Sequence, residues 1–236
     1  MSIPNPTHLL WLDLESTGLD TAVDEIIEIG VIITDLHYDS VIEYRTVVLP
    51  TEAGKARLRD NPFVTEMHRL NGLTAELDAL AGASYTTIEA AEERVLALID
   101  VIGLSAATFH IAGSGVATFD RPLLNRLMPR LAAKLHYAPI DVGILRRSYK
   151  LATGVDLVEV NEDKTHRAID DVRCHLTEGR AFRELFRSTA RTDGQLTGDP
   201  PMDETDNPLS DSSDAKVEVQ PRHRGPRNPL DDGARR

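Results

Sequence analysis

The chain has 236 residues, of which 41 % are apolar and 27 % charged, and its formal net charge is −12 at pH 7. These proportions exclude collagen-like, membrane-spanning and wholly disordered proteins, and no membrane partner is expected. The negative charge argues against a long duplex held through its phosphates, whereas a short nucleic acid held through bound cations is compatible with it. A single cysteine, Cys174, excludes internal disulfides and fits a reducing, cytoplasmic setting.

The composition changes near Ser188. Residues 188–236 contain 6 of the 13 prolines, no Phe, Trp or Tyr, and a net charge of −3. Such a segment buries too little apolar surface to offset its chain entropy. The sequence therefore predicts one domain over residues 1–187 and a disordered tail over residues 188–236.

Within this domain, strands come first and helices follow. Residues 8–15 form an apolar run typical of a buried strand, and the β-branched runs 26–34 and 41–49, joined through His37-Tyr38-Asp39, indicate a hairpin. Helical spacing predicts four helices and a short strand at 107–112; the helices cover residues 87–102, 120–135, 141–152 and 168–186. This order indicates an α/β fold, a mixed sheet with helices on both faces.

Asp13 and Glu15 are the first candidate pair of functional residues. They lie two residues apart at the end of the first strand, so both carboxylates point to the same face of the sheet. Two like charges this close repel each other, and burial increases the repulsion. A divalent cation between them would remove that penalty; a solvated strand end is the alternative explanation.

Two further acids and a histidine follow in the sequence. Asp120 begins a helix after a glycine-rich stretch, a place where aspartate is also favoured by the helix dipole. His166 comes just before the last helix, with Asp171 about one and a half turns inside it and Asp170 rotated towards solvent. Four carboxylates suit two Mg²⁺ or Mn²⁺ ions, which together catalyse in-line displacement at phosphorus. A histidine beside them can accept a proton from the attacking water.

The order and spacing of these residues resemble a known superfamily. The runs WLDLESTGLD at 11–20 and GSGVATFD at 113–120, followed by the His166–Asp171 spacing, are similar to the motifs of the DEDDh 3′–5′ exonucleases over residues 8–187. The resemblance implies an RNase H-like fold whose first three strands are antiparallel, and two-metal catalysis. By position it makes His166 the general base and assigns four metal ligands: Asp13, Glu15, Asp120 and Asp171.

Within the superfamily the chain most resembles the oligoribonucleases, which degrade the shortest RNA fragments to 5′-mononucleotides. The similarity is carried by WLDLE at 11–15, DEIIEIG at 24–30, His136-Tyr137 and IDV at 140–142. It implies a homodimer acting on short single-stranded RNA. It also implies that Leu19 wedges between two bases and that Phe63 stacks on a base. The full set of implied substrate contacts is Thr17, Gly18, Leu19, Phe63 and His68.

The chain departs from the oligoribonuclease pattern at two positions. Those enzymes carry an arginine and a serine that help to cap the 5′ phosphate, and here the positions hold Ala138 and Gly143. Val116–Phe119 look more like the proofreading exonucleases. A proofreading-type exonuclease acting on DNA or on longer single strands is therefore an alternative function. A non-catalytic nucleic-acid-binding module is the alternative from another class.

Overall fold

The computed structural model describes residues 6–80, 87–105, 107–158 and 165–196, without the side chains of 191–196. The chain divides into two units, Met1–Asp193 and Gly194–Arg236, and the first contains every strand and nearly all of the helices described below. Most of the predicted tail, residues 197–236, lies outside the described residues. No helix in the described part of the chain is both long enough and apolar enough to cross a membrane.

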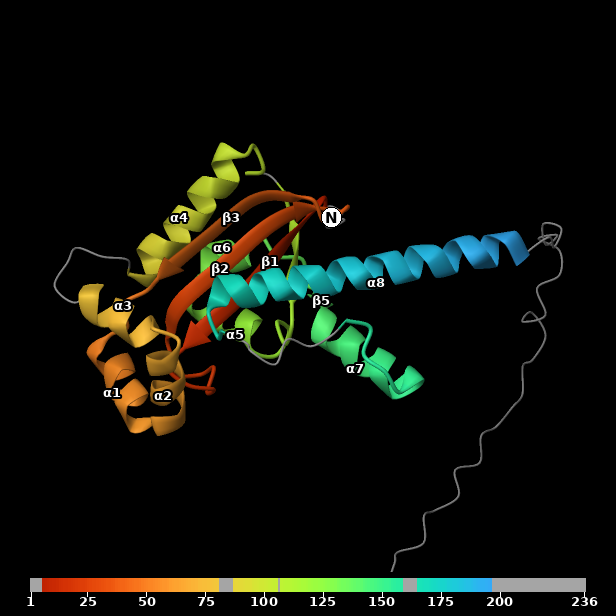
Figure 1. The fold of residues 1–236 in the computed structure, drawn as a ribbon. Coiled ribbons are helices and arrows are strands. Elements are labelled where there is room, and N and C mark those ends of the chain that lie inside the picture. Colours follow the sequence, from red (N-terminus) through yellow and green to blue (C-terminus); the bar gives the residue numbers. More distant parts are fainter. Residues whose placement is uncertain (1–5, 81–86, 106, 159–164, 197–236) are drawn as a thin grey trace, which may run out of the picture. The chain divides into compact units, whose positions relative to one another are not determined.

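A five-stranded mixed sheet forms the centre of the first unit (Figure 1). Its spatial order is β3-β2-β1-β4-β5; β1–β2–β3 are antiparallel, whereas β4 and β5 run parallel to β1. This confirms the predicted α/β fold with three antiparallel strands first. The strands are β1 (His8–Ser16), β2 (Ile26–Asp35), β3 (Ser40–Val47), β4 (Phe109–Gly113) and β5 (Ile140–Asp141).

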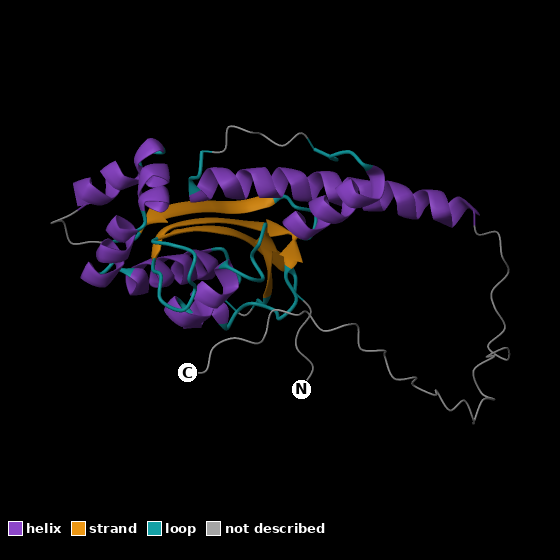
Figure 2. Cartoon of the chain, turned by 90° about the horizontal axis from the view of Figure 1, so that it is seen from below, coloured by secondary structure: helices purple, strands orange, loops and turns teal. Residues whose placement is uncertain are grey.

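Helices cover both faces of this sheet (Figure 2). The long helix α8 packs on one face, and α4, α5 and α6 pack on the other. The remaining helices lie in the connections between these elements. The bounds are α1 (Glu52–Asp60), α2 (Pro62–Leu70), α3 (Leu73–Leu80), α4 (Ile88–Val101), α5 (Asp120–Leu127), α6 (Pro129–Ala132), α7 (Val142–Thr153) and α8 (Ala168–Leu196).

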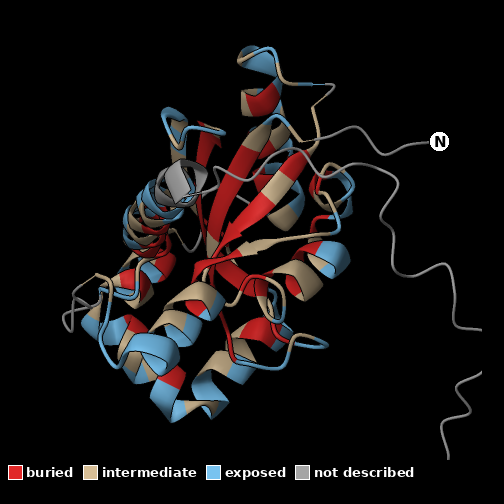
Figure 3. Cartoon of the chain, turned by 90° about the vertical axis from the view of Figure 1, so that its right-hand side faces the viewer, coloured by how far each residue is buried: buried red, intermediate tan, exposed pale blue. Residues whose placement is uncertain are grey.

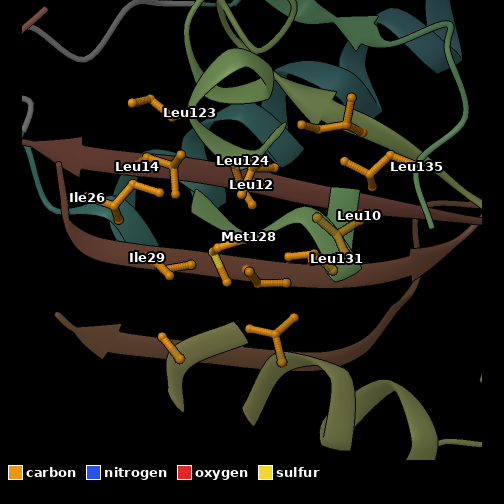
Figure 4. Packing of buried hydrophobic residues seen from close by; sticks show 14 of the residues in the cluster. Leu10, Leu12, Leu14, Ile26, Ile29, Leu123, Leu124, Met128, Leu131 and Leu135 are labelled. Carbon is orange, nitrogen blue, oxygen red and sulfur yellow. The ribbon is translucent and has the colours of Figure 1, made fainter. Parts of the chain in front are cut away.

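The alternation of side chains along β1 divides the core between the two faces. Leu10, Leu12 and Leu14 pack with Met128 and other residues of the α4–α6 layer (Figure 4). Trp11 packs in the second cluster, against residues of α8. Since both faces are covered, the central strands are buried along most of their length (Figure 3). Asp13 and Glu15 have the same parity as Trp11 and therefore point towards α8.

Three helix assignments differ from the sequence prediction. The helix predicted over 120–135 is broken into α5 and α6, because Pro129 lacks an amide hydrogen and disfavours helical geometry at Met128. Helix α8 continues to Leu196, past the predicted domain end at 187, since no proline occurs before Pro200. Helices α1 to α3 were not predicted, although α1 and α2 are capped by Thr51 and Asn61.

Candidate active site

Three carboxylates meet where the end of β1 faces the first turns of α8. Oxygen atoms of Asp13, Glu15 and Asp171 all lie within 4.8 Å of one another, a group able to hold a metal ion. Asp13 and Glu15 share a face of the sheet because they are two residues apart on β1. Asp171 comes from the first turn of α8, which packs on that face. Asp170 is turned away and pairs with Arg173 at 2.8 Å. The geometry thus separates the two adjacent aspartates as their helical rotation requires.

Asp120 approaches the same place from the opposite side of the strand. It is the first residue of α5 and is only 3 % exposed. Burial raises the pKa of its carboxyl to about 7, although hydrogen bonds from the backbone N–H groups of Asp120 and Leu14 oppose the rise. Leu14 lies between Asp13 and Glu15, so the fourth predicted acid rests against the strand that carries the first two. Asp120 also repels Glu15 electrostatically.

The Glu15 carboxyl is buried among several other carboxylates. The pKa of this carboxyl is raised to about 8, chiefly by burial and then by the charges of Asp171, Glu28 and Asp120, while Arg167 opposes the rise. Without a cation this side chain therefore carries a proton at neutral pH. Carboxylate oxygens are the donors that hard divalent cations prefer, and a cation among them would stabilise the ionised forms. The donor set and its electrostatics fit a metal site.

An ion cluster fixes the start of α8 over the sheet. The fully buried Glu28 on β2 accepts hydrogen bonds from the backbone N–H of Ala168, at 3.0 Å, and from Arg167, at 2.9 Å. Arg167 also reaches Glu76 on α3, at 2.8 Å. Gly30 permits the close approach, since a Cβ there would collide with the backbone of Ala168. Asp171, one turn later, is therefore carried on a fixed helix.

His166, the predicted general base, comes immediately before this anchored region. Its side chain is exposed, and its φ of 48° lies in the left-handed region. It lines a pocket of about 580 Å³ together with Asp170 and residues of α2 such as Met67 and Leu70. Thr165 and His166 are the first described residues after the gap at 159–164.

The residues predicted to contact substrate fall into two groups. Leu19 and Phe63 are exposed apolar side chains, at 79 % and 78 %, on the loop after β1 and at the start of α2. Thr17 is buried and donates a hydrogen bond to Asp24 at 2.9 Å, and a Cβ at Gly18 would collide with the same carboxylate. Leu19 and Phe63 thus offer free apolar surface, whereas Thr17 and Gly18 fix the shape of the loop.

His68 is fully buried beneath the loop and next to the acids. Its Nε2 lies 3.1 Å from the carbonyl oxygen of Ser16, to which it donates, and its Nδ1 lies 4.0 Å from Glu15 Oε2. Burial lowers the pKa of the His68 imidazole. The structure therefore places a buried imidazole beside the Glu15 carboxylate.

Two buried residues beside the acids, His175 and Glu28, were not predicted from the sequence. His175 is 4 % exposed, and its Nδ1 lies 4.0 Å from Asp13 Oδ1. The signal was its position four residues after Asp171, which places both side chains on the same face of the helix. A second missed residue, Glu28, pairs directly with Glu15 in the β1–β2 register.

Comparison with known proteins identifies the class to which this fold and acid cluster belong. Residues 10–178 match the family profile described as "Exonuclease", so the chain belongs to the exonuclease family. Among curated relatives it is similar to the oligoribonuclease of Halorhodospira halophila, 34 % identical over 179 residues, which cover 76 % of this chain and 94 % of that protein. The oligoribonuclease of Corynebacterium efficiens is 35 % identical over 181 residues, covering 76 % and 79 %. The predicted resemblance is confirmed.

Solved structures support the fold. Exonuclease I from Methylocaldum szegediense has a TM-score of 0.54 at 18 % identity, over 75 % of this chain and 40 % of that one. The E. coli exonuclease I complex with a dA16 oligonucleotide has a TM-score of 0.53 at 17 % identity, over 75 % and 41 %. This chain thus spans about two fifths of the length of those structures. The predicted exonuclease fold is confirmed.

Proposed function

We propose that the chain removes nucleotides one at a time from the 3′ end of short single-stranded oligoribonucleotides, releasing 5′-mononucleotides. The observation that carries this proposal is the acid cluster at one end of β1, where oxygen atoms of Asp13, Glu15 and Asp171 lie within 4.8 Å of one another. Asp120 interacts electrostatically with Glu15 of this cluster. Curated relatives at 34–35 % identity that are named oligoribonucleases support the choice of short RNA as substrate.

Asp13, Glu15, Asp120 and Asp171 are the residues that would hold two divalent cations, Mg²⁺ or Mn²⁺. Such ions stabilise negative charge on the attacking and leaving oxygens of an in-line displacement at phosphorus. The carboxylates fix the position of the phosphodiester by fixing the ions. His68 Nδ1 lies 4.0 Å from Glu15 Oε2 and His175 Nδ1 lies 4.0 Å from Asp13 Oδ1, so each of these acids has a buried imidazole beside it.

His166 is proposed to accept the proton of the attacking water. The bond from the water oxygen to phosphorus forms as the bond from phosphorus to the 3′ oxygen breaks. The water proton passes to the imidazole, and the departing oxygen takes a proton from solvent. An exposed histidine five residues before Asp171 can exchange this proton with bulk water between turnovers.

Leu19 and Phe63 are proposed to bind the bases. Both are nearly fully exposed, and a phenyl face stacks on any base without selecting its identity. A homodimer is also proposed, because large apolar side chains stand exposed on and around α7 and α8. These side chains are Tyr137 (72 %), Leu151 (88 %), Val155 (58 %) and Phe186 (53 %).

Two positions favour a second candidate function, a 3′–5′ exonuclease on DNA or longer single strands. An enzyme that does not cap the 5′ phosphate does not select for dinucleotides. Ala138 has no side chain that can hold a phosphate. A Cβ at Gly143 would collide with the Ser114 hydroxyl, so a larger residue fits there only if the Ser114 side chain moves.

A single time course separates these functions. RNAs of two, five and twenty nucleotides and a matched DNA, all 5′-labelled, are incubated with the full chain in Mg²⁺ or Mn²⁺, with EDTA controls. Much faster cleavage of the dinucleotide supports the short-RNA enzyme. Equal stepwise trimming of all lengths, or of DNA, supports the general exonuclease. If no substrate is cleaved in either metal, the proposal is wrong and a binding module becomes the better explanation.

A further inference from the structure

The turn between α2 and α3 is bonded to the segment that begins with His166. The Asn71 side chain donates a hydrogen bond through Nδ2 to the backbone carbonyl oxygen of His166. The carbonyl oxygen of Asn71 accepts a hydrogen bond from Arg167 Nη1 at 3.2 Å. Two successive residues of one segment are thus held by a single residue that is nearly one hundred positions earlier in the chain.

His166 has a backbone conformation that needs such support. Its φ of 48° is in the left-handed region, which side chains with a Cβ seldom adopt. Tyr38 is the other non-glycine residue with a positive φ in the described part of the chain. Conformations of this kind persist where surrounding contacts hold them, and they determine where the side chain points.

We propose that Asn71 is a positioning residue for the general base. Its amide holds the His166 carbonyl, and through it the left-handed backbone that directs the imidazole. The next residue, Arg167, is fixed independently by Glu28 and Glu76. Asn71 thereby holds the residue that comes two positions before the first residue of α8. This inference rests on the proposed function, in which His166 accepts the proton of the attacking water.

Asn71 also has a structural role that can be separated from the proposed one. Its Oδ1 accepts a hydrogen bond from the backbone N–H of Leu73 at 2.9 Å, at the beginning of α3. Aspartate caps helices as well as asparagine does, so Asn71→Asp keeps this acceptor. It lacks the amide donor, however, and places a carboxylate oxygen against the His166 carbonyl. Asn71→Ala removes both interactions.

A double-mutant cycle with His166→Ala tests the proposal in the full-length protein. Steady-state rates on the dinucleotide are measured for wild type, Asn71→Asp, His166→Ala and the double variant, together with thermal transitions. We expect Asn71→Asp to lower kcat on the order of 10-fold, with KM changed less than about 2-fold and the transition unchanged. In the His166→Ala background the same substitution should have no further effect on kcat, because its target is already absent.

Two kinds of result would contradict the proposal, and they can be told apart. A loss of kcat of equal size in both backgrounds would assign Asn71 a general structural role and overturn the inference. Full activity of His166→Ala, or no cleavage by the wild-type chain, would overturn the proposed function and the inference with it. Thr87→Ala is the matched control, since Thr87 caps α4 by accepting from Ala90 N–H. It should lower the thermal transition and leave kcat unchanged.

Discussion

Replacement of Glu15 by glutamine removes a buried ionisable carboxyl of the proposed metal site with little change in side-chain shape. The Glu15 carboxyl has a pKa of about 8, chiefly because it is buried, with Asp171, Glu28 and Asp120 adding repulsion. An amide is neutral at every pH and resembles the protonated acid that the metal-free protein holds at pH 7. We therefore expect Glu15→Gln to stabilise the metal-free protein and to abolish cleavage.

The size of the effect follows from proton linkage. Between pH 4.5 and pH 8 the folded state keeps a proton on Glu15 that the unfolded state has released, so stability decreases as pH rises through this window. A carboxyl with a folded pKa of about 8 weakens folding by about 1 kcal/mol at pH 5 and about 4 kcal/mol at pH 8. The Glu15 side chain is only 9 % exposed, so solvent does little to reduce this penalty.

Urea unfolding of wild type and Glu15→Gln at pH 5 and pH 8, in EDTA, measures the difference. The variant should be more stable at pH 8 and nearly equal to wild type at pH 5. Glu93→Gln, whose side chain is 68 % exposed, is the control and should change stability by less than about 0.5 kcal/mol at both pH values. A gain that does not depend on pH, or a loss at pH 8, would refute the electrostatic account of the site.

Three further outcomes are expected. Asp171→Asn should eliminate metal-dependent cleavage while the thermal transition stays within a few degrees of wild type; near-normal turnover in Mg²⁺ would remove Asp171 from the ligand set. Phe63→Ala should raise KM for the dinucleotide on the order of 10-fold with little change in kcat, because an exposed stacking face is lost; an unchanged KM would place the bases elsewhere. Deletion of residues 197–236 should leave the thermal transition unchanged, as calorimetry would show, and a clear decrease would mean that the tail contributes to the folded domain.

The sequence predicted the orientation of those site residues that lie within a single regular strand or helix. The parity of Asp13 and Glu15 on a strand and the helical rotation between Asp170 and Asp171 are properties of regular structure, and both predict which side chains face one another. Asp120 was also a candidate from its position at a helix start after a glycine-rich stretch, and the resemblance to a family then assigned it as a metal ligand. The structure adds that this residue reaches the site from the far side of β1, through the backbone of Leu14.

Contacts between distant segments could not be predicted in this way. Nothing in the sequence around Asn71 indicates that its amide bonds to the His166 carbonyl, because that contact depends on how α2 and α3 pack beside α8. Helices α1 and α2 did carry signals, in Thr51 and in the Asn61-Pro62 pair, but their apolar faces are short. The break at Pro129 is a local effect that outweighs a continuous helical pattern.

The acid cluster is assembled by contacts that do not involve a metal ion. Glu28 repels Glu15 across the β1–β2 register, and the same carboxylate anchors Arg167 and the first amide of α8. Further along α8, Gly179 packs directly against Trp11 of β1. A Cβ at Gly179 would collide with the indole ring. The helix that carries Asp171 is thus fixed at two points on the sheet. The raised pKa values of Glu15 and Asp120 come chiefly from burial, and the charges of Asp171 and Glu28 add to the rise at Glu15. In the proposed metal site these carboxylates would bind a cation with little rearrangement of the backbone, because the strand and helix that carry them are already held in place.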